Sequence, residues 1–231
     1  MLDELEKIRP FIKEQRYVFN GMAVPRVTEI ISKTIHEDYI VKWANSLGFK
    51  HKGYVKTLEE AANYGTKVHG GLENLLKNEI VPEDTPMYPL EGFKMWWEMV
   101  NKDNSITILG QEKKLVCPWF GGTYDMLLDI NGRKFLVDFK TSNHLSYKYC
   151  LQMAAYNYIM EYLGEASIEG IIILQLSKKE IAFNEFVLDF INNQQHREYF
   201  ALCEKTFLSL VNSYYYILET ERQYKSLGEG M

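Results

Sequence analysis

Cysteine is scarce in this sequence. The three cysteines, Cys117, Cys150 and Cys203, lie far apart, and none belongs to a CxxC pair. A structural zinc site uses closely spaced cysteine and histidine ligands, and a disulfide framework needs several cysteine pairs. The sequence supports neither, and we expect all three side chains to be reduced and packed in the interior.

Long hydrophobic runs are also missing. The longest, such as residues 171 to 176, fall well short of the roughly 20 apolar residues that cross a bilayer. The N-terminal segment MLDELEKIRPFIKEQ mixes charges of both signs and lacks the apolar core of a secretory signal. We therefore expect no membrane span and a cytoplasmic protein.

The sequence has no excess of positive charge. It contains 26 Lys and Arg residues against 31 Asp and Glu residues, which gives a net charge of −5. A protein that holds nucleic acid by its overall electrostatic attraction is normally basic. Any site for a polyanion must therefore be local.

No internal repeat, low-complexity tract or linker divides the 231 residues, so their length fits one elaborated domain. Hydrophobic spacing and turn signals predict an α/β order of elements, with a loop over 79–90 where three prolines occur. We expect helices over 2–15, from Glu29 onward, 37–78 with breaks near Gly48 and Gly65, 91–100, 146–163 and 189–225. We expect strands over 105–117, 122–130, 133–140, 168–176 and 180–188.

Four local signals refine this outline. Asn20-Gly21 and Asn131-Gly132 are typical of two-residue hairpin turns. Thr28 is a candidate cap for the helix that begins at Glu29, and the pair Gly70-Gly71 within a helical pattern indicates close packing of the backbone.

Two charged residues interrupt the strand KFLVDFK, which spans residues 134–140. Because side chains alternate between the faces of a strand, Asp138 and Lys140 share one face. The Asn131-Gly132 turn makes the preceding strand GTYDMLLDI an antiparallel neighbour, which can bring Asp125 close to both. Two adjacent carboxylates repel each other unless a proton or a cation lies between them, and such an oxygen-rich site suits Mg²⁺ or Mn²⁺. A solvated surface pair between Asp138 and Lys140 is the alternative.

Two helical patterns contribute further polar side chains. His69 and Glu73 lie four residues apart, so both can point from one helix face toward one site. Lys148, Gln152 and Tyr156 share a face of the helix that follows the Asp-x-Lys strand. Taken alone, each pattern also fits a packed histidine or the solvated side of a helix.

The order of these pieces resembles the PD-(D/E)XK nuclease superfamily, in particular its RecB-like and phage-type exonuclease branch. The resemblance is carried by His69 with Glu73, then GTYD, VDFK and QMAAY, together with VPRVTEI upstream, and it covers residues 22 to 160. It implies a restriction-endonuclease-like core in which helices flank a central mixed sheet, with extra N- and C-terminal helices. It also implies one domain over 1–231: a mainly helical part over 1–104 carrying His69, a catalytic sheet and helix over 105–188, and a C-terminal helix over 189–231.

The resemblance implies a role for each site residue. His69, Asp125, Asp138 and the backbone carbonyl of Phe139 would bind Mg²⁺ or Mn²⁺, with Glu73 as a further candidate ligand. Lys140 would act as a positioned cation or, with a lowered pKa, as a proton acceptor for water. Gln152 and Tyr156 match the Q-x-x-x-Y motif of the family, which supports the site and contacts the DNA backbone.

The implied function is metal-dependent hydrolysis of DNA. The protein would act as an exonuclease on single-stranded or duplex ends. Its role would be in recombination, repair or phage DNA processing, in a bacterial cell or phage-infected host. A structure-specific endonuclease and a catalytically silent DNA-binding subunit are the alternatives. Because the three cysteines are scattered, we expect no iron–sulfur cluster. The sequence has no GxxxxGK[ST] loop, so any ATP-driven movement on DNA would come from a recombination or replication partner. Candidate DNA contacts are Arg26, Thr28, Lys148, Gln152 and Tyr156, with Trp43, Tyr64 and Trp119 as candidate base-stacking residues.

Overall fold

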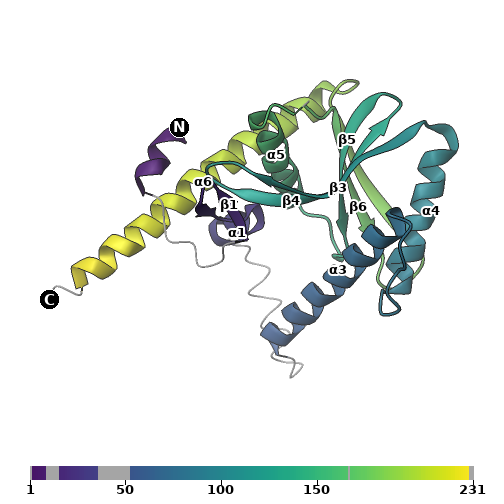
Figure 1. The fold of residues 1–231 in the computed structure, drawn as a ribbon, viewed down its shortest axis with the longest axis horizontal. Coiled ribbons are helices and arrows are strands. Elements are labelled where there is room, and N and C mark those ends of the chain that lie inside the picture. Colours follow the sequence, from purple (N-terminus) through teal and green to yellow (C-terminus); the bar gives the residue numbers. More distant parts are fainter. Residues whose placement is uncertain (1, 9–15, 36–52, 166, 229–231) are drawn as a thin grey trace.

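The chain forms a mixed five-stranded sheet with helices on both faces (Figure 1). The structure, a computed structural model, describes residues 2–8, 16–35, 53–165 and 167–228. The strands lie in the order β3-β4-β5-β6-β7. Their bounds are β3 Ile106–Val116, β4 Gly121–Ile130, β5 Arg133–Lys140, β6 Gly170–Leu176 and β7 Phe183–Asp189.

The sheet pairing follows from the connections between strands. The tight turn at Asn131 and Gly132, both at positive φ, joins β4 and β5 as an antiparallel pair. Helix α5 (Tyr147–Tyr162) crosses over from β5 to β6 and makes these two strands parallel, while β3 and β7 add antiparallel edges. The α/β class and the mixed sheet expected from the sequence are confirmed.

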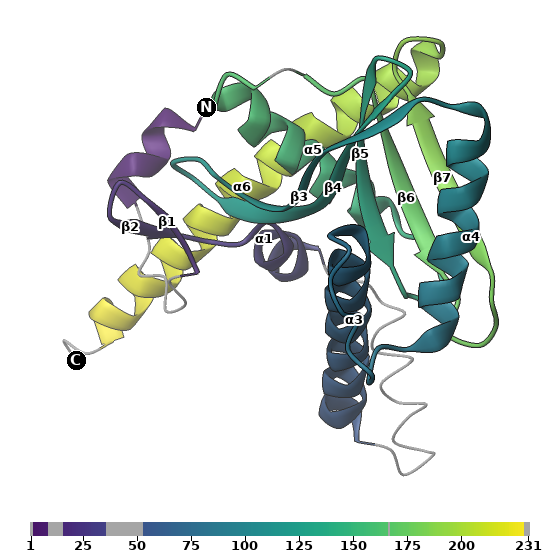
Figure 2. The same cartoon turned by 45° about the vertical axis from the view of Figure 1, so that its right-hand side comes forward.

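Each face of the sheet buries its own hydrophobic cluster. Alternate strand residues such as Leu136 and Ile173 pack under α5 and α6 (Gln194–Gly228), and their neighbours Val137 and Ile172 pack under the helices of the other face. Those helices are α3 (Tyr54–Leu76) and α4 (Met87–Asp103), as Figure 2 shows. The near-continuous hydrophobic sequence of β5 and β6 is therefore explained by burial on both sides.

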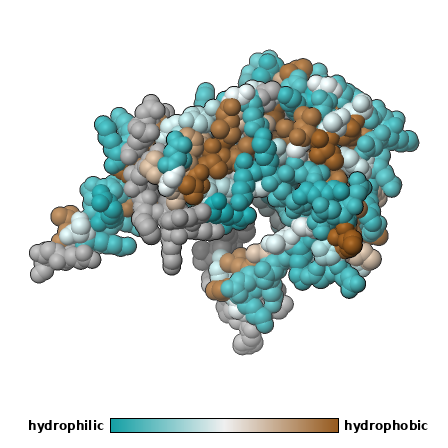
Figure 3. Space-filling view, viewed as in Figure 1, coloured by the Kyte–Doolittle hydropathy of each residue, from teal (hydrophilic) through white to brown (hydrophobic). Residues whose placement is uncertain are grey.

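Helix α3 is only partly packed against the sheet. Its buried residues Val68, Gly71 and Leu72 all lie in the second half, whereas Val55 and Leu58 near its start are exposed. In Figure 3 the surface around α4 is mostly hydrophilic, and α3 stands out from the body with hydrophobic side chains near its free end. The second half of α3 is thus the part that is positioned firmly at the sheet.

The N-terminal segment packs against α6 and the start of β4. It contains a 3-10 helix, η1 (Asp3–Ile8), the hairpin β1 (Tyr17–Phe19) and β2 (Met22–Val24) with its turn at Asn20-Gly21, and α1 (Val27–Thr34). Only residues 2–8 of the helix expected over 2–15 are described, and they form the shorter 3-10 helix. Leu5 is fully buried, which explains the apolar spacing there.

Several sequence-based boundaries were wrong. Helix α1 begins at Val27 after the N-cap residue Arg26, so Thr28 lies in the first turn and does not cap it. Helix α4 begins at Met87, within the expected loop, because Pro89 falls in the first helical turn, where the backbone N–H has no intrahelical partner. The expected break near Gly48, and Trp43, lie outside the described residues.

Two further boundaries differ for local reasons. Helix α3 runs through Gly65 without a break, because burial of Val68 and Leu72 offsets the helix cost of about 1 kcal/mol for a glycine. Helix α6 begins at Gln194 and not at Asp189, because the Asp189 carboxylate accepts the backbone N–H groups of Ile191 and Asn192 and forms a turn.

The three cysteines are free and buried, as the sequence predicted. In the described part of the chain, no helix combines the length and the apolar character that crossing a bilayer requires.

The glycine pair in α3 divides into one packed and one open position. A Cβ on Gly71 would overlap the side chain of Thr85 in the loop before α4, whereas a Cβ on Gly70 would meet nothing within 4 Å. The predicted close packing is therefore confirmed at Gly71 only.

We expect Gly71→Ala to lower the free energy of unfolding by about 1–3 kcal/mol, because the added methyl group overpacks against Thr85. Gly70→Ala, its matched control, should raise it by about 0.5–1 kcal/mol, because alanine is the better helix former. Urea unfolding of both variants measures these changes. Equal effects would contradict the packing described for Gly71.

Candidate metal centre

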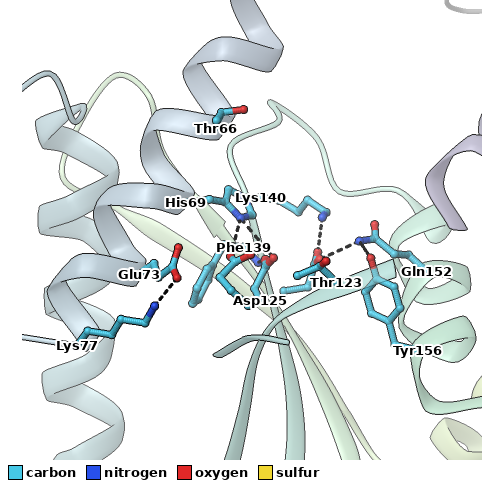
Figure 4. A network of polar contacts seen from close by, with 12 residues as sticks. Thr66, His69, Glu73, Lys77, Thr123, Asp125, Phe139, Lys140, Gln152 and Tyr156 are labelled. Carbon is cyan, nitrogen blue, oxygen red and sulfur yellow. Dashed lines mark hydrogen bonds and ion pairs between the residues drawn. The ribbon is translucent and has the colours of Figure 1, made fainter. Parts of the chain in front are cut away.

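Two carboxylates and one ammonium group meet at one end of the β4–β5 pair. The ladder ends at Met126 opposite Val137, so the next residues, Asp125 and Asp138, come close together as the sequence predicted. Beyond that point the Asp125 carboxylate accepts the backbone N–H of Phe139 at 2.6 Å. Figure 4 shows Asp125, Phe139 and Lys140 gathered between α3 and α5.

Asp138 is the most deeply buried of the charged groups. It is 1% exposed. Its carboxylate forms an ion pair with Lys140 Nζ and accepts a hydrogen bond from the side-chain amide of Gln152. Burial raises the pKa of Asp138 to about 6; Lys140 opposes this shift and the negative charge of Asp125 adds to it. The surface-pair alternative is wrong, because this pair is enclosed.

Lys140 is held as a cation. Its Nζ lies 4.9 Å from the centre of the Tyr149 ring, in addition to the ion pair with Asp138. Burial by itself lowers the pKa of Lys140, but the carboxylates of Asp138 and Asp125 outweigh it, and the pKa is raised. The lowered pKa considered from the sequence is therefore wrong in this arrangement, because two anions surround the ammonium group.

His69 reaches the site from α3. Its Nδ1 lies 3.3 Å from Oδ1 of Asp125 and 3.9 Å from Oε1 of Glu112. Burial acts to lower the pKa of His69, but the Asp125 carboxylate raises it to about 10. A proton on the imidazole and a metal ion would therefore compete for the same carboxylates.

Glu112 belongs to the site although no sequence pattern identified it. It lies on β3 between the pairs Gln111–Met126 and Lys113–Tyr124, which places it opposite Asp125. Its φ of 43° is in the left-handed region, which is uncommon for a residue other than glycine and concentrates at functional sites. The only signal was its position in a strand next to the Asp125 strand, and the register of that pairing was not readable from the sequence.

One atom from each of His69, Glu112 and Asp125 lies within 4.8 Å of the others, so these three residues could hold a metal ion. An imidazole nitrogen with carboxylate oxygens suits Mn²⁺, and the carboxylates suit Mg²⁺. Asp138 lies next to this trio with its carboxylate turned toward Lys140 and Gln152. The residues present thus fit a divalent cation.

Glu73 does not join this cluster. Its carboxylate forms an ion pair with Nζ of Lys77, which lies four residues later at the C-cap of α3. Figure 4 shows the pair to one side of His69. The i, i+4 spacing of His69 and Glu73 suggested a second ligand, but Glu73 and Lys77 have the same spacing. In the structure Glu73 pairs with Lys77.

The Q-x-x-x-Y residues form a connected network. The Gln152 amide donates to Asp138 at 3.2 Å and to the Tyr156 hydroxyl at 2.9 Å. Lys148, on the same helix, donates to the carbonyl of Ile35 at 3.2 Å. Gln152 therefore orients Asp138, while Lys148 links α5 to the end of α1.

A small cavity of about 200 Å³ opens beside Asp125. It is lined by Arg16, Tyr17, Arg26, Val27, Thr28, Glu112, Gly121, Gly122, Thr123, Asp125 and Tyr156. The Tyr17 and Thr123 hydroxyls hydrogen-bond at 2.9 Å and tie the N-terminal hairpin to β4. The structure thus brings Arg26 and Thr28 next to the carboxylate cluster; we name this space the Arg26 cavity.

The aromatic candidates differ in their placement. Trp119 is 9% exposed and packs edge-on against Tyr162 in the core, so it offers no stacking surface. Tyr64 on α3 is partly exposed and has Lys178 Nζ 4.8 Å from its ring centre.

No protein-family model matches the sequence, and no curated protein is found as a relative. Among solved structures, SSO0001 is similar with a TM-score of 0.37 and 14% identity over 91% of this chain and 83% of that chain. An alkaline exonuclease, LHK-Exo, from Laribacter hongkongensis has a TM-score of 0.32 and 14% identity over 60% of this chain and 72% of its own. Its complex with dAMP has a TM-score of 0.31 and 14% identity over 71% and 85%. At such TM-scores these similarities carry no argument about function, which depends on the site itself.

The two glutamates give a direct test of the metal centre. We expect Glu112→Gln to weaken Mn²⁺ binding at least about tenfold. Even substitutions of residues that only support the ligands commonly reduce metal affinity by about 10- to 100-fold. Glu73→Gln, with the same loss of charge, should keep nearly the wild-type affinity, because Glu73 pairs with Lys77. Calorimetric titration with Mn²⁺ measures both, and the reverse order would assign the ligand to Glu73.

Proposed function

We propose that this chain is a Mg²⁺- or Mn²⁺-dependent deoxyribonuclease that hydrolyses phosphodiester bonds at DNA strand ends. The observation that carries the proposal is the enclosed cluster of Asp125, Asp138 and Lys140, with His69 and Glu112 beside it. A site that only stabilised the fold would gain little from burying two adjacent carboxylates, because the desolvation of such charges is costly.

The metal ligands in this proposal are His69, Asp125, Asp138 and the carbonyl of Phe139, with Glu112 in place of Glu73. The N–H and C=O groups of one strand residue face the same neighbouring strand. Since the N–H of Phe139 donates to Asp125, its carbonyl faces the β4 side as well. These residues would hold a Mg²⁺ or Mn²⁺ ion, which would supply Lewis-acid polarisation of a phosphate oxygen and activation of the attacking water near neutral pH.

The remaining residues position the reacting groups. Lys140, as a cation between Asp138 and the Tyr149 ring, stabilises negative charge that develops on the phosphate and orients the attacking water. Gln152 holds the Asp138 carboxylate, and Tyr156 holds Gln152. These two therefore act chiefly through the geometry of Asp138.

The Arg26 cavity supports action at a strand end. Arg16 and Arg26 supply positive charge beside the Glu112 and Asp125 carboxylates, which would hold the metal ion. Thr28 lies in the first turn of α1, where backbone N–H groups favour an anion. At about 200 Å³ the cavity is smaller than the sites of about 300–1,000 Å³ that enclose drug-sized ligands. It suits a terminal phosphate group better than a strand that continues, and it meets the need for a local anion site in a chain of net charge −5.

Replacement of Lys140 and Asp138 tests the assigned chemistry. We expect Lys140→Ala to reduce single-turnover cleavage of DNA by about 10²- to 10³-fold, the usual cost of losing one stabilising donor, while Mn²⁺ affinity stays near the wild-type value. Asp138→Ala should lose both cleavage and Mn²⁺ affinity. Lys77→Ala, which removes the ion-paired lysine at the C-cap of α3, is the control and should cleave normally. Near-normal cleavage by either site variant would remove that residue from the proposal.

The form of the DNA distinguishes the modes of action. End-labelled linear DNA should be degraded in Mg²⁺ or Mn²⁺, and circular single- and double-stranded DNA should remain intact. Cleavage of circular DNA would indicate an endonuclease. Binding of DNA without cleavage under any of these conditions would indicate a DNA-binding subunit and would overturn the enzymatic proposal.

A further inference from the structure

A second, larger cavity lies where β5 and β6 end and β7 begins. Its volume is about 470 Å³, within the range of about 300–1,000 Å³ that is typical of ligand sites. We name it the β5–β6 cavity. It is lined by Thr141, Ser142, Asn143, His144, Gln175, Leu176, Ser177, Lys178, Lys179, Ala182, Phe183 and Asn184.

The lining of the β5–β6 cavity combines polar and apolar groups and carries positive charge. It offers hydroxyl and amide groups together with Lys178 and Lys179, and it includes no acidic residue. The nearby Glu185 is directed away, because its carboxylate accepts the Trp96 indole N–H at 2.9 Å. In a chain of net charge −5, this is a local environment that favours an anionic ligand.

The cavity is also held in shape by specific contacts. The Gln175 amide donates to the carbonyl of Ser142 at 2.7 Å, and Asn184 donates to Gln175 at 3.5 Å. Lys178 lies over the Tyr64 ring of α3, and burial lowers the pKa of this lysine. Within the described residues, Lys178 and Lys179 form no ion pair. No carboxylate of the described chain therefore lies within ion-pair distance of either lysine.

The position of the cavity relates it to the metal centre. Thr141 and Ser142 directly follow Lys140, so the near wall of the cavity begins where the metal centre ends. In the strand order β3-β4-β5-β6-β7, the Arg26 cavity lies at β3 and β4, and the metal centre lies at β4 and β5. The β5–β6 cavity lies on the other side of the metal centre, at β5, β6 and β7. Figure 2 shows β5 and β6 ending at the same side of the sheet, beside α3. The two cavities therefore flank the metal centre along one edge.

We propose that the β5–β6 cavity is a nucleotide-binding subsite for the continuing, unpaired strand of the DNA substrate. Lys178 and Lys179 would bind a backbone phosphate, and the amides of Gln175 and Asn184 would bind base or sugar groups. The strand would then extend from its end in the Arg26 cavity, across the metal centre, into this subsite. This inference rests on the nuclease function proposed above and adds the path of the substrate.

A pair of matched double variants tests the subsite. Lys178→Ala with Lys179→Ala removes the two cavity charges, and Lys102→Ala with Lys134→Ala removes two lysines located where α4 ends and β5 begins, at the opposite end of the sheet. Cleavage of a long single strand and of a dinucleotide, whose single internucleotide phosphate is the one that is cleaved, is measured for each variant with its melting temperature and Mn²⁺ affinity. The dependence of long-strand binding on salt is measured in parallel.

We expect the cavity variant to show a raised KM for the long strand with an unchanged kcat and unchanged kinetics on the dinucleotide. For each phosphate group that the variant no longer binds, the slope of log affinity against log salt concentration should decrease in magnitude by about 0.7. The control variant should keep the wild-type KM and slope.

Two results would overturn the inference alone: wild-type KM and salt slope in the cavity variant, or equal impairment on the dinucleotide and the long strand. In both cases the nuclease function would stand if the wild-type chain cleaves DNA in the same assay. Failure of the wild-type chain to cleave any DNA in Mg²⁺ or Mn²⁺ would overturn the proposed function and the subsite together.

Discussion

The burial of Asp138 beside Asp125 is the constraint on which the rest of this site depends. A carboxylate that is 1% exposed loses most of its hydration, and a second carboxylate nearby adds repulsion. The fold compensates with Lys140, the Gln152 amide, the Phe139 N–H and His69, which come from β5, α5 and α3. Removing one partner would leave a buried charge uncompensated, so the positions of these segments are linked to one another.

The sheet topology provides the common location. The parallel β5–β6 pair requires the crossover helix α5, and that helix carries Gln152 and Tyr156 past the end of β5. On the other face, α3 brings His69 to the same end of the sheet, with Gly71 packed closely against Thr85. The same edge also contains the two cavities, so positively charged side chains lie on both sides of the carboxylates.

The part of the site that the sequence predicted depends on local geometry. The alternation of strand residues and the Asn131-Gly132 turn were sufficient to place Asp125, Asp138 and Lys140 together, because a two-residue hairpin defines its own register. The four-residue spacing of Gln152 and Tyr156 likewise predicted that they share one face of α5, where the structure shows them hydrogen-bonded. These features involve residues that are near in sequence or joined by a tight turn.

The features that sequence reasoning missed depend on non-local geometry. Glu112 enters the site through a strand whose register shifts between Ile108 and Gly110, and through a positive φ that no residue preference indicates. Glu73, a further candidate ligand from its spacing to His69, pairs instead with Lys77, which lies at the same spacing on its other side. The burial of Trp119 and the β5–β6 cavity arise from segments that meet only in the folded chain.

Anomalous X-ray diffraction at the manganese edge, on crystals of the wild-type chain soaked in Mn²⁺, tests the central claim most directly. The account predicts an anomalous peak at coordinating distance from His69, Asp125 and Glu112, with Asp138 facing the same ion. No peak at this cluster, or a peak only at a different position in the chain, would contradict the claim that a divalent cation compensates the buried carboxylates.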